Sequence, residues 1–283
     1  MRAPAPALRL PLHVETTGRE PGPDTPTFLL LHGFGASSFS WRTWAAALAA
    51  RGHVVFVDLK GFGSAPRPDD GAYGIEDQAE LVLRLIRQRG LRRVTLVGHS
   101  MGGGVALLVA LGLLDSDPGC LDRMVIVAGA AYRQRLPPFV ALARWPRLSG
   151  AGLRVLGTRR VIRWVLRSIV AEPDAVTGSQ VEGYADPLDS AEARRALFEV
   201  ARGLVPDDLD AITARYPEIA VPTLVLWGRD DRVVPLRIGQ RLAEALPRAE
   251  LEVLDDCGHI PAEERPEESL EILTAFLERT TGA

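Results

Sequence analysis

Short, continuous apolar runs alternate with longer segments of helical periodicity along most of the chain. Continuous Val, Leu and Ile content is typical of parallel strands that are covered on both faces, and its alternation with helices indicates a mostly parallel sheet. The predicted strands are 27–31, 53–58, 94–97, 123–127, 223–227 and 251–254. The predicted helices are 41–51, 77–89, 101–114, 236–246 and 267–279. The opening segment, 8–15, is expected to add an antiparallel strand or two at the sheet edge.

The alternation breaks between about residue 130 and residue 217. Prolines divide the helical patterns there into short pieces, and they are Pro137, Pro138, Pro146, Pro173, Pro187 and Pro206. We therefore predict one α/β domain, made of residues 1–130 and 217–283, that carries a helical insertion over residues 131–216. The insertion is expected over the carboxyl ends of the strands, where open α/β sheets bind ligands.

A serine stands at the junction of a predicted strand and an apolar helix. Strand 94–97 runs into Gly98-His99-Ser100-Met101-Gly102, which has the G-x-S-x-G pattern of a nucleophile elbow in its required context. Such a tight turn tolerates only small residues two positions either side of the serine, and it places the hydroxyl at the head of a helix. The pattern predicts a nucleophilic Ser100. The alternative is a glycine-rich turn whose serine only caps the helix.

With these motifs, the chain resembles the α/β-hydrolase fold family over residues 8–130 and 217–280. The resemblance implies a mostly parallel central sheet flanked by helices, with residues 131–216 as a helical cap. It also implies that nucleophile, acid and histidine follow in that order, each on a loop after a strand.

Among five histidines, only His259 follows both the serine and a plausible acid. It lies beyond the last predicted strand, between Gly258 and Pro261, which can hold a loop histidine in place. The serine needs such an imidazole to take its proton and later return it to the leaving group. We predict His259 as the base, against the alternative of an ordinary surface histidine; His99 is expected to have a packing role.

The acid is sought in the turn after strand 223–227. This turn resembles the family's G-x-x-D pattern, which selects Asp231, three residues after Gly228. Asp230 is the rival, and a solvated turn aspartate is the structural alternative. Some relatives carry the acid after the preceding core strand, but here the segment 127–131 has no carboxylate. Asp231 is expected to hold the imidazole tautomer and stabilise the imidazolium.

The segment His32-Gly33-Phe34-Gly35 follows a strand, as the family's H-G loop does. The resemblance implies that the oxyanion is bound by the backbone N–H groups of Phe34 and Met101. His32 is expected to order this loop, and Asp58 to bond local backbone in a structural turn.

Composition excludes several functional classes. The 283 residues carry a formal charge of −3, which argues against general nucleic-acid binding. No P-loop, dinucleotide fingerprint or metal-ligand spacing appears, so we expect neither cofactor nor metal. Two cysteines suit a reducing compartment. The start of the chain shows no apolar stretch of signal-peptide length, and the apolar, uncharged run 101–114 is too short to span a bilayer. A cytoplasmic protein is expected.

Charge is distributed unevenly. Residues 131–171 hold nine arginines and no Asp or Glu, so the remaining chain has 24 basic against 36 acidic residues, about −12. One interpretation is contact with an acidic substrate, an acyl-carrier partner or an anionic membrane. We favour the other, a solvated helix face that the acidic body partly neutralises.

We expect a serine hydrolase that cleaves small-molecule carboxylic esters through an acyl-enzyme on Ser100. The alternatives are a thioesterase or a carbon–carbon bond hydrolase of vinylogous diketones, whose members resemble this chain at Met101, Gly102 and 229–232 but commonly have Asn where His99 stands. A non-catalytic ligand-binding protein on the same fold is less favoured. Acyl and alcohol groups and the oligomeric state are left open.

Overall fold

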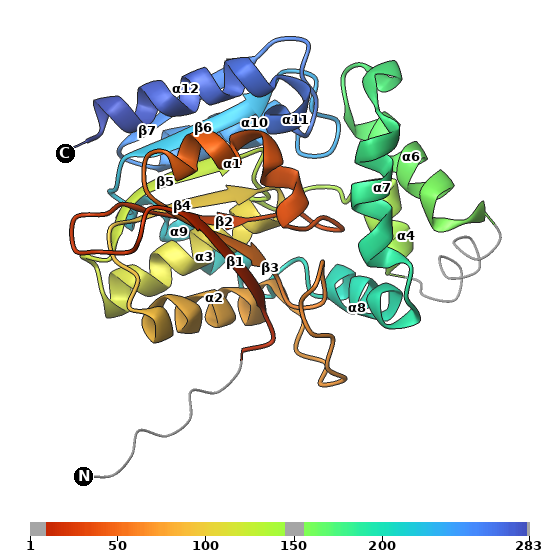
Figure 1. The fold of residues 1–283 in the computed structure, drawn as a ribbon, viewed down its shortest axis with the longest axis horizontal. Helices are drawn as coiled ribbons and strands as arrows, with labels where there is room; N and C mark the ends of the chain where they lie inside the picture. The colour runs from red at the N-terminus through yellow and green to blue at the C-terminus, as the bar shows by residue number, and fades with distance from the viewer. Residues whose placement is uncertain (1–9, 145–155, 282–283) are drawn as a thin grey trace.

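A computed structural model describes residues 10–144 and 156–281. Its sheet has seven strands in the order β1-β3-β2-β4-β5-β6-β7 (Figure 1). The strands are β1 His13–Gly18, β2 Thr27–Leu31, β3 His53–Asp58, β4 Val94–His99, β5 Leu121–Val127, β6 Thr223–Gly228 and β7 Ala249–Leu254. All pairings are parallel except that of β1 with β3. The predicted α/β-hydrolase fold is confirmed.

The opening strand differs from its prediction. It was expected within residues 8–15, yet β1 spans His13–Gly18 because it follows the whole length of β3, from the pair His13–Asp58 to the pair Gly18–His53. It is a single antiparallel edge strand whose last four residues are exposed.

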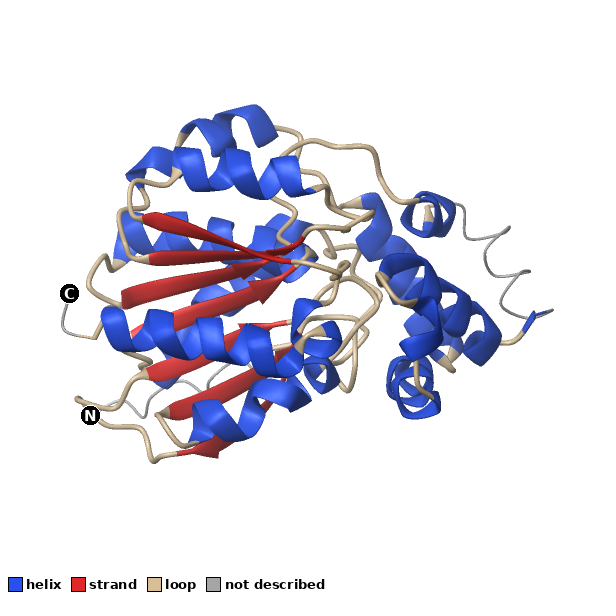
Figure 2. Cartoon of the chain, turned by 90° about the horizontal axis from the view of Figure 1, so that it is seen from above, coloured by secondary structure: helices blue, strands red, loops and turns tan. Residues whose placement is uncertain are grey.

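Helices cover both faces of the sheet (Figure 2). Strand alternation directs Leu29 and Leu31 into one core cluster, with α2, α3 and α10, and Phe28 and Leu30 into a second cluster, with α1 and α12. This division explains why the strands read as continuous apolar runs. The core helices are α1 Arg42–Ala49 after η1 Ser38–Trp41, α2 Ile75–Arg89, α3 Met101–Ser116, α10 Leu236–Ala245, α11 Pro261–Glu264 and α12 Pro266–Arg279.

Between β5 and β6 the described chain is helical and lies at the end of the sheet toward which the parallel strands point (Figures 1 and 2). Prolines stand in the first turns of several of these helices, where a missing N–H costs nothing. The elements are α4 Pro138–Ala143, α6 Thr158–Ile169, η2 Pro173–Ala175, α7 Gly178–Ala185, η3 Asp186–Leu188, α8 Ala191–Arg202, α9 Leu209–Ala214 and η4 Tyr216–Glu218. Of the six prolines that divide the helical patterns in the sequence, Pro146 lies outside the described residues. Among the helices described, none is both long and apolar enough to cross a membrane.

Candidate active site

Ser100 occupies a strained turn between β4 and α3. Its φ of 52° and ψ of −117° lie in a region that non-glycine residues rarely adopt. The turn is tied to the neighbouring strand, since the Ser100 N–H donates to the Val127 carbonyl at 3.0 Å and the Ala130 N–H donates to the Ser100 carbonyl at 2.9 Å. These bonds hold the hydroxyl at the carboxyl end of the sheet.

Glycine is required on both sides of this turn. A Cβ on Gly98 would lie 2.3 Å from the Gly102 carbonyl oxygen, and one on Gly102 would lie 2.3 Å from the Leu31 carbonyl oxygen. Both obstacles are backbone atoms, which cannot move aside as a flexible side chain can. The structure therefore supplies the steric reason for the G-x-S-x-G pattern.

The structure brings together the three side chains that the sequence singled out. The Nε2 atom of His259 lies 2.9 Å from the Oγ atom of Ser100, and its Nδ1 atom lies 2.8 Å from Oδ2 of Asp231. Since a carboxylate can only accept, Nδ1 carries the proton and Nε2 is free to accept the serine proton. All three residues are buried. This chain of bonds can activate a serine for attack on a carbonyl carbon.

Asp231 is fixed by its own turn. Its Oδ1 atom accepts hydrogen bonds from the N–H groups of Val233 and Val234, at 2.8 and 2.9 Å, and its Oδ2 atom faces His259. The rival Asp230 is exposed. One residue of difference in the turn thus decides which carboxylate reaches the imidazole.

The residues expected to form the oxyanion hole lie beside Ser100. Phe34, in the loop after β2, and Met101, the first residue of α3, line the same cavity as the serine. His32 orders this loop, as predicted: its Nδ1–H donates to the Gly33 carbonyl at 2.8 Å and its Nε2 accepts from the Leu59 N–H at 3.0 Å. Asp58 bonds the backbone of its own turn, as expected, by accepting from the Ser64 N–H, and it also accepts from the Ser38 N–H, 20 residues away in the chain.

His99 does more than pack against its neighbours. Its Nε2–H donates to the carbonyl of His259 at 2.8 Å, and the two imidazole rings lie 4.9 Å apart. Burial, with the nearby His259, lowers the pKa of His99 to about 3. A neutral His99 therefore anchors the backbone of the candidate base. Sequence reasoning missed this bond because His99 is next to Ser100 in the chain but 160 residues from His259.

Glu264 was also missed, and it joins the base loop to the insertion. Its carboxylate accepts from three backbone N–H groups: Ala171 at 2.7 Å, Gly258 at 2.9 Å and Ile260 at 3.0 Å. In addition, the His259 N–H donates to the Ile169 carbonyl at 2.9 Å. The end of α6 and the loop of His259 are therefore held by shared bonds.

We expect Glu264→Ala to lower the free energy of unfolding by about 2–4 kcal/mol, because three N–H groups lose a charged acceptor. We also expect kcat for a turned-over ester to fall about a hundredfold at temperatures where the variant is fully folded, since the base loop loses its support. Urea unfolding and steady-state kinetics measure the two effects. Glu264→Gln should recover part of both, while Glu268→Ala, an exposed neighbour, should change neither. A folded Glu264→Ala with unaltered kcat would contradict the positioning role.

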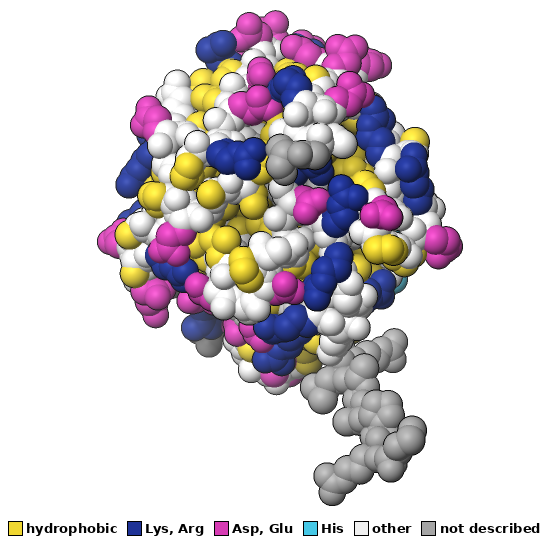
Figure 3. Space-filling model, turned by 90° about the vertical axis from the view of Figure 1, so that its left-hand side faces the viewer, with side chains coloured by type: hydrophobic (Ala, Val, Ile, Leu, Met, Phe, Trp, Pro, Cys, Tyr) yellow, Lys and Arg dark blue, Asp and Glu magenta, His cyan; other side chains and the backbone are white. Residues whose placement is uncertain are grey.

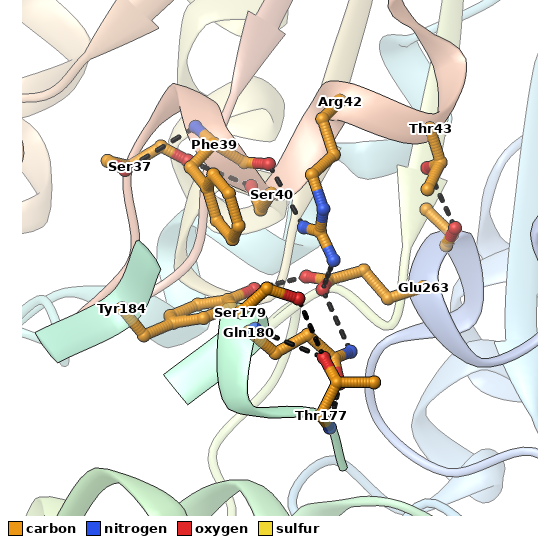
Figure 4. Close-up of polar contacts among 11 residues, drawn as sticks. Ser37, Phe39, Ser40, Arg42, Thr43, Thr177, Ser179, Gln180, Tyr184 and Glu263 are labelled. Atoms are coloured by element: carbon orange, nitrogen blue, oxygen red, sulfur yellow. Dashed lines mark hydrogen bonds and ion pairs between the residues drawn. The ribbon is translucent and has the colours of Figure 1, made fainter. Parts of the chain in front are cut away.

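A second polar cluster joins the insertion to the core beside the same loop (Figure 4). The buried carboxylate of Glu263 receives hydrogen bonds from the Tyr184 hydroxyl, from Gln180 Nε2 at 3.2 Å and from Arg42 at 2.6 Å. Burial, and then the Glu263 charge, raises the pKa of Tyr184 well above its usual range. Tyr184 belongs to α7 and lines the cavity of Ser100. Adjacent carboxylates, Glu263 and Glu264, thus hold two separate parts of the insertion.

Ser100 and His259 open into a cavity of about 670 Å³. Most of its lining is aliphatic or aromatic and comes from the insertion, including Val140, Leu166 and Phe198. The charged side chains among the described lining residues are Arg160 and Arg194, with no Asp or Glu. The cavity therefore suits an apolar molecule that contacts the serine.

The described residues contain no cluster of three or more His, Cys, Asp or Glu side chains suited to a metal ion. Cys120 and Cys257 are both free and buried, and burial raises the pKa of each thiol. A protonated, buried Cys257 is a poor nucleophile.

Comparison with known proteins places these features in a family. A model of the alpha/beta hydrolase family matches residues 28–272. A 2-hydroxy-6-oxononadienedioate/2-hydroxy-6-oxononatrienedioate hydrolase of Paraburkholderia phymatum is 31% identical over 267 residues, covering 90% of this chain and 88% of the relative.

Two solved structures are also similar. The 2-hydroxy-6-oxo-6-phenylhexa-2,4-dienoate hydrolase of Rhodococcus sp. strain RHA1 has a TM-score of 0.78 at 27% identity, covering 94% of both chains. An esterase of Exiguobacterium antarcticum has a TM-score of 0.77 at 23% identity, covering 94% of this chain and 95% of the other, a likeness of fold. The chain belongs to the alpha/beta hydrolase family.

Proposed function

We propose that this protein is a serine hydrolase that cleaves carboxylic esters with an apolar acyl group. The observation that carries the proposal is the bonded set Ser100, His259 and Asp231, of which Ser100 and His259 line an apolar cavity. The insertion, residues 131–216, acts in this proposal as a cap that shapes the cavity. The reaction needs no cofactor, and we propose a cytoplasmic location.

In the first half-reaction, the Oγ atom of Ser100 attacks the acyl carbonyl carbon while Nε2 of His259 takes the hydroxyl proton. Asp231 stabilises the imidazolium that forms. The backbone N–H groups of Phe34 and Met101 bind the oxyanion of the tetrahedral intermediate. The intermediate collapses when the bond to the alkoxy group breaks and His259 returns its proton to the departing alcohol.

In the second half-reaction, water attacks the acyl-enzyme. His259 takes a proton from that water, and the second tetrahedral intermediate breaks its bond to Oγ. The proton then passes to Ser100, which releases the carboxylic acid. Every proton taken by His259 is returned, so the enzyme ends in its starting state.

A second candidate is hydrolysis of a carbon–carbon bond in a vinylogous diketone. It is favoured by the 31% identical relative, whose name states a dienedioate hydrolase activity. A dienedioate carries two carboxylates, and the described cavity lining holds two cations, Arg160 and Arg194, among mostly apolar side chains. We place ester hydrolysis first because apolar side chains make up most of that lining. Thioesters, which present the same carbonyl chemistry, are a further alternative.

A substrate panel tests the choice. We expect kcat/KM for p-nitrophenyl esters to rise from acetate to octanoate by about fourfold per methylene group, because each added CH₂ is buried in the cavity. The panel includes the matching thioesters and a 2-hydroxy-6-oxo-dienoate, all assayed at one pH. Rapid diketone cleavage with negligible ester turnover would reverse the order of the two candidates. No turnover of any acyl substrate would favour a ligand-binding role.

A further inference from the structure

Three large apolar side chains are unusually exposed, and all three lie at one place. Leu142, Leu156 and Trp164 are 50%, 56% and 59% exposed, and within the described ranges no other large apolar side chain is as exposed. Each of them also lines the cavity of Ser100. They therefore form an apolar rim at the mouth of this cavity, on α4, on α6 and two residues before α6.

Unpaired cations stand beside the rim. Arg159 is bonded to Glu182, Asp186 and Asp189, and Arg167 is paired with Asp174. By contrast, Arg160 and Arg163 are exposed and form no ion pair with any residue that the structure describes. Arg160 is four residues before Trp164 on α6, so the two side chains are neighbours on one helix face.

We propose that the rim of Leu142, Leu156 and Trp164, with Arg160 and Arg163, is a docking surface for an anionic lipid bilayer. Exposed tryptophan and leucine side chains enter the boundary between headgroups and acyl chains, and adjacent arginines pair with anionic headgroups. The two interactions require the same orientation of the protein on the bilayer, because Arg160, Arg163 and Trp164 all belong to α6. Docked in this way, α4 and α6 face the bilayer.

The cavity favours a lipid surface over an acidic protein as the occupant. An acidic protein would match the arginines but would leave the apolar rim without a hydrocarbon partner. The rim is continuous with a cavity whose described lining has no carboxylate, so hydrocarbon can pass from a bilayer toward Ser100 without crossing water. This delivery of a substrate rests on the proposed esterase function, whereas the docking itself does not.

The face of the molecule opposite the insertion is different. Figure 3 shows Lys and Arg side chains interspersed with Asp and Glu side chains over that face. Mixed charges give no net attraction to an anionic surface. Arg89, the last residue of α2, and Arg248, just before β7, are exposed and precede strands, so they lie toward the amino ends of the sheet, away from Ser100. These two arginines supply a matched control.

Vesicle co-sedimentation tests the charge requirement. We expect the protein to bind vesicles of phosphatidylcholine mixed with phosphatidylglycerol and to bind phosphatidylcholine vesicles weakly or not at all. The double variant Arg160→Gln/Arg163→Gln should bind the anionic vesicles about twenty-five-fold more weakly, at about fivefold per arginine. Arg89→Gln/Arg248→Gln, with the same loss of charge, should bind as the unaltered protein does. Equal binding to both vesicles, or equal loss in both double variants, would overturn the proposal.

Tryptophan fluorescence tests the orientation. Trp41, Trp44 and Trp227 are buried, and Trp145, outside the described residues, is replaced by Phe in every sample. We expect vesicles with brominated acyl chains to quench Trp164, and Trp164→Phe to remove the quenching. Trp164→Ala should weaken binding about tenfold, with circular dichroism verifying the fold. Quenching that survives Trp164→Phe would place another face on the bilayer and overturn the proposal.

These experiments distinguish failure of the docking proposal from failure of the proposed esterase function. Sedimentation and quenching need no turnover, so they report docking even if no ester is hydrolysed. Conversely, turnover of soluble short-chain esters by a protein that binds no vesicle would leave the esterase proposal intact and overturn the docking surface. Capture by an acidic carrier protein without any vesicle binding would also overturn it, in favour of a protein partner.

Discussion

Ser100→Ala is expected to lower kcat for a p-nitrophenyl ester by about a millionfold, the size of loss seen when a nucleophilic serine is removed from a hydrogen-bonded triad. The substitution removes one atom, the Oγ that lies 2.9 Å from His259 Nε2. The strained turn remains possible, because glycines 98 and 102 and the bonds to Val127 and Ala130 are untouched. Initial rates of hydrolysis measure the effect.

The control for this substitution is Ser116→Ala, at the other end of α3, where the hydroxyl only bonds the Gly112 carbonyl. It should leave kcat unchanged. A fluorophosphonate probe should label the unaltered protein and Ser116→Ala but not Ser100→Ala. Residual activity above about one hundredth in Ser100→Ala would show that another group attacks the carbonyl.

Asp231→Asn is expected to lower kcat by about ten thousandfold with little change in KM. An amide can still accept from the N–H groups of Val233 and Val234, so the turn is kept. It no longer stabilises the imidazolium, and its NH₂ group favours the tautomer of His259 that carries the proton on Nε2. In that tautomer Nε2 cannot accept the Ser100 proton. Steady-state kinetics at saturating ester measures the loss.

Asp230→Asn is the matched control, because it makes the same chemical change one residue earlier in the same turn. Its carboxylate is exposed, and the triad distances do not involve it. We expect a kcat within about twofold of the unaltered protein, as for most surface substitutions. A large loss of kcat in Asp230→Asn with an unchanged kcat in Asp231→Asn would show that the choice of Asp231 is wrong.

Much of the fold and the site follows from local patterns. The elbow is recognisable because its steric demands act within a few residues, on Gly98 and Gly102 around Ser100. The core strands are recognisable because both of their faces are covered, which gives unbroken apolar runs. Asp231 was favoured over Asp230 because its spacing from Gly228 resembles the G-x-x-D turn of the family.

The contacts that sequence reasoning missed join segments far apart in the chain. Glu264 bonds Ala171 across 93 residues, and Glu263 bonds Tyr184 across 79. Nothing periodic or compositional connects such pairs, because they depend on how the insertion rests on the core. The arginine excess of residues 131–171 is visible in the sequence. Its partial neutralisation is not, because the carboxylates that pair with Arg159 lie further along the insertion, at Glu182, Asp186 and Asp189.

The bonds of Glu263 and Glu264 bear on how this enzyme could be re-engineered. Exchanging residues 131–216 for the corresponding segment of a relative would be a natural way to alter specificity. Here the segment shares hydrogen bonds with Glu263 and Glu264, two of the five residues that follow His259, and with the His259 N–H itself. The exchangeable module is therefore discontinuous. A chimaera must transfer the segment 258–264 together with the insertion, because exchanging the insertion alone would remove the hydrogen bonds that hold His259 in place.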